Sequence, residues 1–147
     1  MKKMIGLIAV ALILAGLPDQ AAWGKDLTRD EVRRCMDFGY DIMRAEERLE
    51  LGERAQRDIN RRLNGTTNRD YQRQLTRDYN KEVRKQSRRI ENYEDYLLPR
   101  FNKDCARRSV QTSDYERVCN TQDRMENPFC RSFPDLANRV KRKKGWK

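Results

Sequence analysis

The chain contains no histidine among its 147 residues. Histidine is the commonest general base in enzymes and the commonest protein ligand for transition metals. Its absence also excludes a C-x-x-C-H haem attachment site and the Glu-x-x-His ligands of carboxylate di-iron bundles. The sequence therefore excludes catalysis and metal binding that depend on histidine.

Other catalytic and metal-binding motifs are missing as well. The sequence has no G-x-S-x-G elbow, no phosphate-binding loop and no C-x-x-C pair of the kind that binds structural zinc. The acids Glu46, Glu47 and Glu50 stand among arginines on an exposed-looking helical face, where nothing tunes a pKa for acid–base work. We therefore expect a protein that is not an enzyme and that holds no metal and no cofactor.

The one long apolar run, Met4–Leu17, lies near the N-terminus and is shorter than the ~20 residues that a membrane span needs. It follows two lysines, ends at Pro18, and precedes the small-x-small sequence A-W-G at positions 22–24. This arrangement is typical of a secretory signal peptide. We expect residues 1–24 to be removed on export, to the periplasm in preference to the medium, which leaves a mature chain without a transmembrane span.

All four cysteines, Cys35, Cys105, Cys119 and Cys130, lie in the mature part of the chain. An even number of cysteines in an exported protein indicates disulfides, here two. Cys105 and Cys119 lie almost symmetrically about a turn at residues 109–113. This favours a Cys105–Cys119 bridge with Cys35 paired to Cys130, and the other two pairings remain open.

Hydrophobic residues recur at helical spacing through most of the mature chain. A seam with heptad spacing runs along the first helix, made of Cys35, Ile42, Leu49, Gln56 and Leu63 with Phe38, Ala45, Gly52 and Ile59 interleaved. A second seam consists of Thr76, Val83, Ile90 and Leu97 with Tyr79, Gln86 and Tyr93 interleaved. A five-residue turn, N-G-T-T-N, joins the two helices and favours an antiparallel, coiled-coil-like hairpin.

The sequence thus predicts an all-α protein, a long antiparallel helical hairpin with a short, disulfide-stapled helical C-terminal segment packed at its open end. One helical domain covers residues 25–138, with hairpin helices at about 28–64 and 68–97. Short helices cover about 99–109, 113–125 and 134–142, and residues 139–147 form a frayed basic tail. Thr28 with Glu31 and Ser113 with Glu116 are predicted capping boxes, and Pro99 is predicted to kink or restart the helix.

Because a narrow seam buries little, the open end of the hairpin needs a small core of its own. The predicted core residues are Val32, Cys35, Met36, Phe38, Tyr93, Leu97, Leu98, Phe101, Tyr115, Val118, Met125, Phe129 and Phe133.

The formal net charge of +10 is distributed unevenly. Residues 54–89 hold 12 lysines and arginines against 4 acids, whereas residues 25–53 and 90–138 each carry slightly more acids than bases. Cations recur every four residues at Arg69, Arg73, Arg77, Lys81, Lys85 and Arg89. Like charges at this spacing repel by roughly 0.2–0.5 kcal/mol per pair, so we expect something to offset them. Interhelical ion pairs from Lys81, Arg84 and Lys85 to Glu46, Glu47, Glu50 and Glu53 are the predicted compensation for part of this row.

Those ion pairs leave the turn between the helices without compensation. The candidate anion- or partner-binding residues there, which we call the tip, are Arg57, Arg61, Arg62, Arg69, Arg73 and Arg77. Arginine makes bidentate hydrogen bonds to phosphate and carboxylate groups. The alternative is that these arginines are a soluble surface with no ligand. Local acids are expected at Glu53 for Arg57 and at Asp58 for Arg62.

We expect an exported helical binding protein of the cell envelope, whose tip contacts an anionic surface or an acidic protein. An exported protein meets little nucleic acid, which disfavours that partner. Its charge and shape resemble those of periplasmic holdase-type chaperones, without any shared residue motif, and a chaperone role is one alternative. An inhibitor or accessory subunit of another exported protein is a second alternative. A homodimer through the seam, with Gln56 and Gln86 setting its register, is a further expectation.

Overall fold

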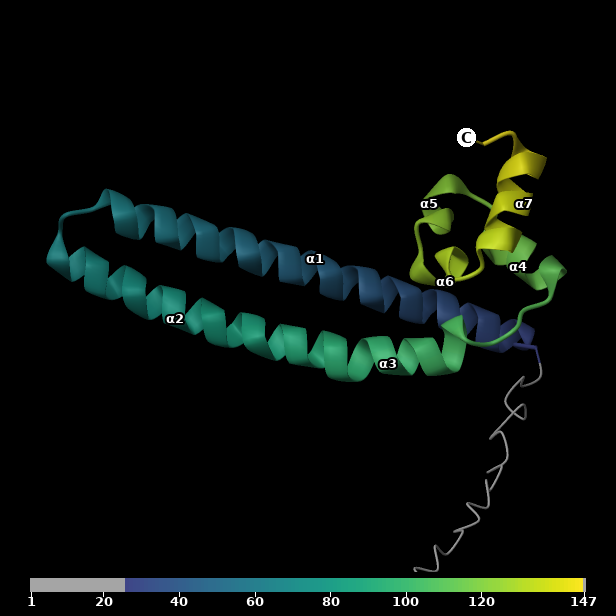
Figure 1. Cartoon of the computed structure of the whole chain (residues 1–147), viewed down its shortest axis with the longest axis horizontal. Helices are drawn as coiled ribbons and strands as arrows, with labels where there is room; N and C mark the ends of the chain where they lie inside the picture. The colour runs from purple at the N-terminus through teal and green to yellow at the C-terminus, as the bar shows by residue number, and fades with distance from the viewer. Residues whose placement is uncertain (1–25, 147) are drawn as a thin grey trace, which may run out of the picture.

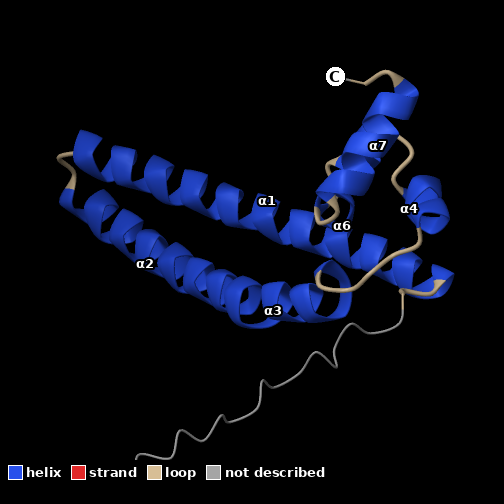
Figure 2. Ribbon diagram, turned by 45° about the vertical axis from the view of Figure 1, so that its right-hand side comes forward, coloured by secondary structure: helices blue, strands red, loops and turns tan. Residues whose placement is uncertain are grey.

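The computed structural model describes residues 26–146, which are mostly helical and contain no strand beyond an isolated Leu27–Val110 bridge (Figures 1 and 2). The predicted all-α class is therefore confirmed, while the predicted signal peptide, residues 1–24, lies outside the described residues. The elements are α1 (Arg29–Gly65), α2 (Arg69–Glu91), the π-helical turn η1 (Asn92–Leu97), α3 (Leu98–Phe101), the π-helical turn η2 (Asn102–Ala106), α4 (Thr112–Val118), α5 (Gln122–Met125), α6 (Pro128–Arg131) and α7 (Pro134–Lys144).

The long helices α1 and α2 lie side by side, and the short helices gather at one end of them, beside the first turns of α1 (Figure 1). We call residues 46–91 the arm and residues 112–146 the C-terminal lobe. The predicted capping box starts α1, since the Glu31 amide donates to Thr28 Oγ1 at 3.3 Å and the Thr28 amide donates to Glu31 Oε2 at 2.7 Å. Asn68 Oδ1 caps α2 by accepting the amides of Asp70 and Tyr71.

The contact between α1 and α2 is narrow and partly polar. Gly52 is buried and allows the side chain of Gln86 to come close to α1, where Gln86 Nε2 donates to the Leu49 carbonyl at 2.8 Å. Gln86 is only 6% exposed. Nearer the lobe, the Tyr93 hydroxyl donates to Glu46 Oε1 at 2.6 Å. Gln86 is therefore occupied within one chain, which removes it from the predicted seam between two copies.

The predicted second seam is wrong at Thr76 and Ile90, whereas Val83 and Leu97 are half-buried as predicted. Leu75 is buried, whereas Thr76 is exposed and Ile90 is 39% exposed. The residues a heptad apart from Leu75 are Glu82 and Arg89, which are charged and so gave no apolar signal in the sequence. Arg89 Nη1 lies 3.0 Å from Glu82 Oε1, and this ion pair lets both side chains lie partly buried beside α1.

The helical run continues through Pro99, where a π-helical turn precedes a new α-helical segment, α3. The Leu98 amide donates to the Tyr93 carbonyl, five residues back, in the π-helical turn η1. In an α-helix the prolyl ring would clash with the carbonyl four residues back, and the wider π turn relieves this contact. The helical run then ends at Ala106 in η2, before the predicted boundary at residue 109.

The predicted helix 113–125 is two helices, α4 and α5. The chain leaves helical geometry at Cys119, and Thr121 Oγ1 caps α5 by accepting the Arg124 amide. The predicted capping box of Ser113 and Glu116 does not form, because α4 begins after Gln111 without a side-chain cap. The short helix α6 was not predicted, and the Asn127 side chain caps it by accepting the Phe129 amide at 2.9 Å.

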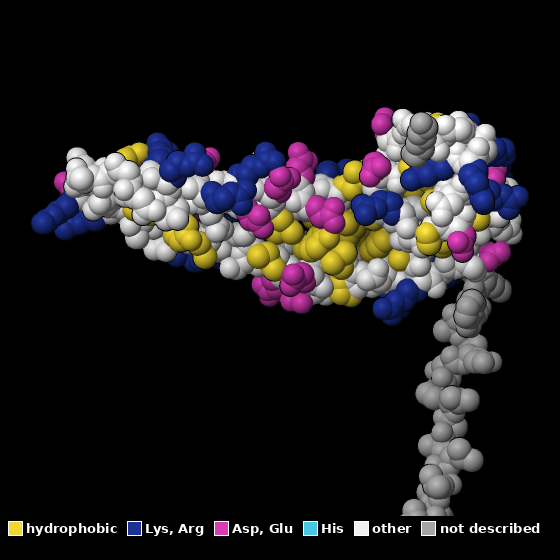
Figure 3. Space-filling view, turned by 45° about the horizontal axis from the view of Figure 1, so that its top comes forward, with side chains coloured by type: hydrophobic (Ala, Val, Ile, Leu, Met, Phe, Trp, Pro, Cys, Tyr) yellow, Lys and Arg dark blue, Asp and Glu magenta, His cyan; other side chains and the backbone are white. Residues whose placement is uncertain are grey.

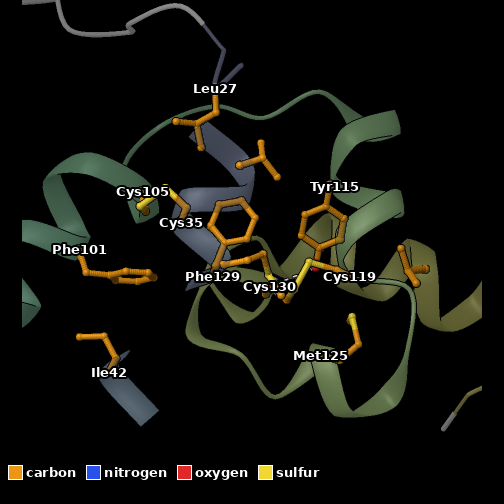
Figure 4. Close-up of a cluster of buried hydrophobic side chains, with 13 residues drawn as sticks. Leu27, Cys35, Ile42, Phe101, Cys105, Tyr115, Cys119, Met125, Phe129 and Cys130 are labelled. Carbon is orange, nitrogen blue, oxygen red and sulfur yellow. Dashed lines mark hydrogen bonds between the residues drawn. A yellow bond between two sulfur atoms is a disulfide. The ribbon is translucent and has the colours of Figure 1, made fainter. Parts of the chain in front are cut away.

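The disulfides are Cys35–Cys105 and Cys119–Cys130, so the predicted pairing is wrong (Figure 4). The chain after Cys105 passes beside the start of α1, where the Leu27 amide donates to the Ser109 carbonyl at 2.8 Å. This course brings Cys105 against the second turn of α1, next to Cys35. Helices α4 to α6 then fold back on themselves, which brings Cys119 to Cys130.

The core lies around these disulfides and joins α1, α3 and the C-terminal lobe (Figure 4). Every predicted core residue either belongs to this buried cluster or packs against it. Tyr115 is fully buried, and its hydroxyl donates to the Cys130 carbonyl at 2.8 Å. Leu27 and Val140, which were not among the predicted core residues, are buried in the same cluster, as is Ile42 of the first seam.

A buried polar residue, Asn127, fixes the lobe to α1. Its side chain is 0% exposed, and Asn127 Nδ2 donates to the Met36 carbonyl at 3.0 Å. Gly39 makes this approach feasible, because a Cβ atom at Gly39 would lie 1.9 Å from Asn127 Oδ1.

We expect Gly39→Ala to lower the free energy of unfolding by roughly 1–3 kcal/mol, because it displaces Asn127 and leaves buried polar groups without partners. The control is Gly65→Ala, since a Cβ atom at Gly65 meets nothing within 4 Å. Denaturant unfolding followed by circular dichroism measures both variants. Equal stability of the two alanine variants would contradict this role of Asn127.

Removing the Cys35–Cys105 bridge is expected to cost more stability than removing Cys119–Cys130. The two loops span 70 and 11 residues, so the loop-closure entropy corresponds to roughly 4 and 3 kcal/mol. Denaturant titration of the Cys35→Ala/Cys105→Ala and Cys119→Ala/Cys130→Ala variants tests the order. A non-reducing peptide map that links Cys105 to Cys119 would overturn the pairing itself.

Candidate functional site

The six candidate arginines occupy the end of the arm that lies away from the C-terminal lobe. Arg57, Arg61 and Arg62 lie in the last turns of α1, and Arg69, Arg73 and Arg77 lie in the first turns of α2. All six side chains are exposed. Figure 3 shows Lys and Arg side chains along the arm and at its far end.

Acidic neighbours neutralise only part of this charge. Arg57 lies 3.5 Å from Glu53, and Arg73 lies 3.9 Å from Asp70. Asp58 pairs with Arg61 at 3.8 Å, which corrects the expectation that it pairs with Arg62. Among the residues of the arm, no ion pair is found for Arg62, Arg69 or Arg77.

Arginines at four-residue spacing on α2 surround a shallow, open hollow. Arg69, Arg73 and Arg77 line it together with Gln72 and Thr76. Gln72 Nε2 donates to the Thr66 carbonyl at 2.7 Å, which ties the hollow to the turn between the helices. Successive arginines are about 6 Å apart along the helix axis, so the row can contact several anionic groups of one surface. The open shape suits an extended anionic surface better than an enclosed small molecule.

The predicted ion pairs between the helices do not form. Over residues 26–146, each charged partner of the arm's acids lies on the same helix, as in Lys85–Glu82 at 3.5 Å and Arg54–Glu50. Glu47, Glu50 and Glu53 are exposed, and Glu46 accepts the hydrogen bond of Tyr93 instead of pairing with a cation of α2. The repulsion along the α2 row is therefore offset by local pairs and by solvent, and no bridge from α1 reduces it.

A groove that was not predicted from the sequence lies beside the C-terminal lobe. It has a volume of about 610 Å³, and its lining residues include Met43, Glu46, Glu47, Glu50, Phe101 and Glu126. Figure 3 shows hydrophobic side chains gathered between the long helices near the lobe, with acidic side chains around them. At its edge, burial and the hydrogen bond to Glu46 raise the pKa of Tyr93 to about 12. The acids Glu46, Glu47 and Glu50 are the part of this groove that stood out in the sequence. The fold brings Phe101 and Glu126 next to them.

The basic C-terminal segment is not a frayed tail. Helix α7 continues to Lys144 and ends at Gly145, whose φ of 69° lies in the left-handed region that favours glycine. Lys143 Nζ donates to Glu116 Oε2 at 2.8 Å, and Arg139 lies 3.9 Å from the same carboxylate. Trp146 packs against the core. This segment is held in place and is a weaker candidate for a free anion-binding patch.

Comparison with protein-family models, with curated proteins and with solved structures finds no match. Within residues 26–146, no group of three or more metal-binding side chains comes together. None of the helices described here combines the length and hydropathy of a membrane span. The two disulfides indicate an oxidising environment.

We expect α7 to loosen as the pH falls below 4.5, the ordinary pKa of a glutamate. The hydrogen bond from Lys143 and the charge of Arg139 lower the pKa of Glu116, so this stabilisation is present above pH 4.5 and is lost as Glu116 protonates below it. The emission of Trp146 in a chain of residues 25–147, where it is the only tryptophan, reports the change.

In Glu116→Gln the emission should be shifted already at neutral pH and should show no further transition below pH 4.5. Glu126→Gln, in the same lobe, is the control and should titrate like the parent. An unchanged acid transition in Glu116→Gln would show that this carboxylate does not hold α7.

Proposed function

We propose that the protein is an exported, non-enzymatic binding protein of the cell envelope, and that its tip contacts an anionic surface. In this proposal α1 and α2 form a coiled-coil-like hairpin in solution, and the disulfide-bonded base keeps that hairpin in place. The signal-like N-terminal sequence and the two disulfides support export, to the periplasm in preference to the medium.

The observation that carries this proposal is the open hollow lined by Arg69, Arg73 and Arg77. A helix that needed only solubility could alternate cations with acids, as the lobe-proximal half of α1 does. Here three arginines form one row. Among the described residues, Asp70 is the one acid that pairs with any of them. Guanidinium groups that repel one another gain most from a ligand that carries several negative charges.

A surface of phosphate headgroups fits this row better than a single acidic side chain. The hollow is open and lies at the end of an elongated arm, so a flat surface can reach it without contacting the lobe. An acidic protein carries the same chemistry, and its binding is an outcome that the vesicle experiment separates from lipid binding.

A holdase-type chaperone remains the second candidate, because large apolar side chains are exposed along the arm and its base. Leu51 and Tyr96 are both 54% exposed, and the groove near Phe101 is partly apolar. Chaperone activity would appear as suppressed aggregation of an unfolded client in high salt, where charge contacts are screened. Arginine-dependent binding to vesicles would not produce that result.

We expect the protein with both disulfides formed to bind vesicles containing phosphatidylglycerol and not vesicles of phosphatidylcholine alone. Each basic residue near an anionic membrane contributes about 1 kcal/mol, so Arg69→Gln/Arg73→Gln/Arg77→Gln should weaken binding roughly hundredfold. Co-sedimentation at low and physiological salt measures the affinity.

The matched control is Lys103→Gln/Arg107→Gln/Arg117→Gln, which removes the same charge from exposed positions at the opposite end of the molecule. This control should retain most of the affinity. If both triple variants bind equally well, the attraction is due to net charge and the tip is not a site. If neither vesicle binds but an acidic protein does, the lipid surface is the wrong partner.

A further inference from the structure

One face of α1 is covered by the C-terminal lobe near its start and is bare farther along. Met36 and Gly39 lie on this face and contact Asn127, while Met43 lines the groove beside Pro128. These positions are three or four residues apart and so share one side of the helix. Glu47 and Glu50, farther along α1, line the same groove, and Arg54, Arg57 and Arg61 beyond them are exposed.

The bare part of the face carries charge in a definite order. Its residues, again three or four positions apart, are Glu47, Glu50, Arg54, Arg57 and Arg61. All five are exposed, and they lie on the side of α1 opposite to Gly52, which faces α2. Acids come first along the chain and arginines second, with Gly52 at the midpoint.

This order makes the face complementary to itself. Glu50 and Arg54 lie two positions on either side of Gly52, and Glu47 and Arg57 lie five positions on either side. When a second α1 lies antiparallel against the first, related to it by a two-fold axis at the level of Gly52, each acid faces an arginine of the other copy. Leu51, which is 54% exposed, lies at the edge of this face beside the axis and adds apolar contact there.

We propose that two copies of the chain pair in antiparallel fashion through this outer face of α1. Such a pair is isologous, with Glu47 and Glu50 of each copy against Arg57 and Arg54 of the other.

Charge complementarity supports a second copy as the occupant. The four charged residues lie within five positions of Gly52, so the two helices need contact each other only over this short stretch. Helices that cross at an angle diverge away from the contact, which carries the end of each α1 past the lobe of the other copy. The predicted dimer through the seam is different, because Gln86 of the seam is already buried against α1.

Existing ion pairs on this face do not prevent the pairing. Arg54 contacts Glu50 and Arg57 contacts Glu53, but all four side chains are about 60% exposed, so each can accept a second partner. Exposed charge pairs contribute little individually and are screened by salt. The dimer is therefore modest in affinity and weakens as salt is added. Arg69, Arg73 and Arg77 belong to α2, which leaves the anion-binding hollow open in the dimer.

Charge exchange tests the proposal. Glu47→Arg/Glu50→Arg makes all four positions around Gly52 basic, and Arg54→Glu/Arg57→Glu makes the same four positions acidic. Sedimentation equilibrium of the protein with both disulfides formed should show each variant as a monomer, with self-association weakened by at least about tenfold. An equimolar mixture of the two variants restores all four acid–arginine contacts and should form a heterodimer.

Two further variants decide the interpretation. The fourfold variant with both exchanges should dimerise like the parent, because its acids and arginines have only changed places. Arg69→Gln/Arg73→Gln/Arg77→Gln should also dimerise like the parent, which separates this interface from the proposed anion site. A parent protein that is monomeric in low salt at high micromolar concentration, or a mixture that stays monomeric, would overturn the proposal.

Discussion

The Cys35–Cys105 disulfide is the constraint on which the rest of the structure depends. It joins the start of α1 to the end of the helical run that returns from the arm, and it closes a loop of 70 residues. Loop closure of that length is worth roughly 4 kcal/mol to the folded state. The arm needs this support, because its buried side chains are few and one of them, Gln86, is polar. With its base fixed, the arm can carry charged residues on most of its exposed positions.

Local signals in the sequence were sufficient for much of the fold. The cap at Thr28, the turn at residues 64–68 and the apolar residues around the disulfides predicted α1, the start of α2 and the core. Contacts between distant segments were not predictable in the same way. The pairing of Cys35 depended on the course of residues 107–110 past Leu27, which no local pattern encodes. Glu116 looked like part of a cap and is instead an anchor for Lys143.

For the candidate site, too, features within one helix were predictable and contacts between distant segments were not. Arginine spacing along α2 was readable because the period of a helix is fixed, and the structure places Arg69, Arg73 and Arg77 around one hollow. The groove at Met43 could not be predicted from the sequence, because Phe101 and Glu126 reach it from segments far apart in the chain. The ion pair of Glu82 with Arg89 likewise concealed one track of the seam, because charged residues carry no apolar signal.

Charge on the arm thus has two separate arrangements, one on each helix. On α1, acids and arginines follow in an order that suits a second copy of the same helix. On α2, arginines form a row that suits an external anion. Hydrogen–deuterium exchange of the protein with and without phosphatidylglycerol vesicles tests this division most directly. Our account predicts added protection at residues 69–77 in low salt, whereas protection confined to α7 or to the groove would contradict it.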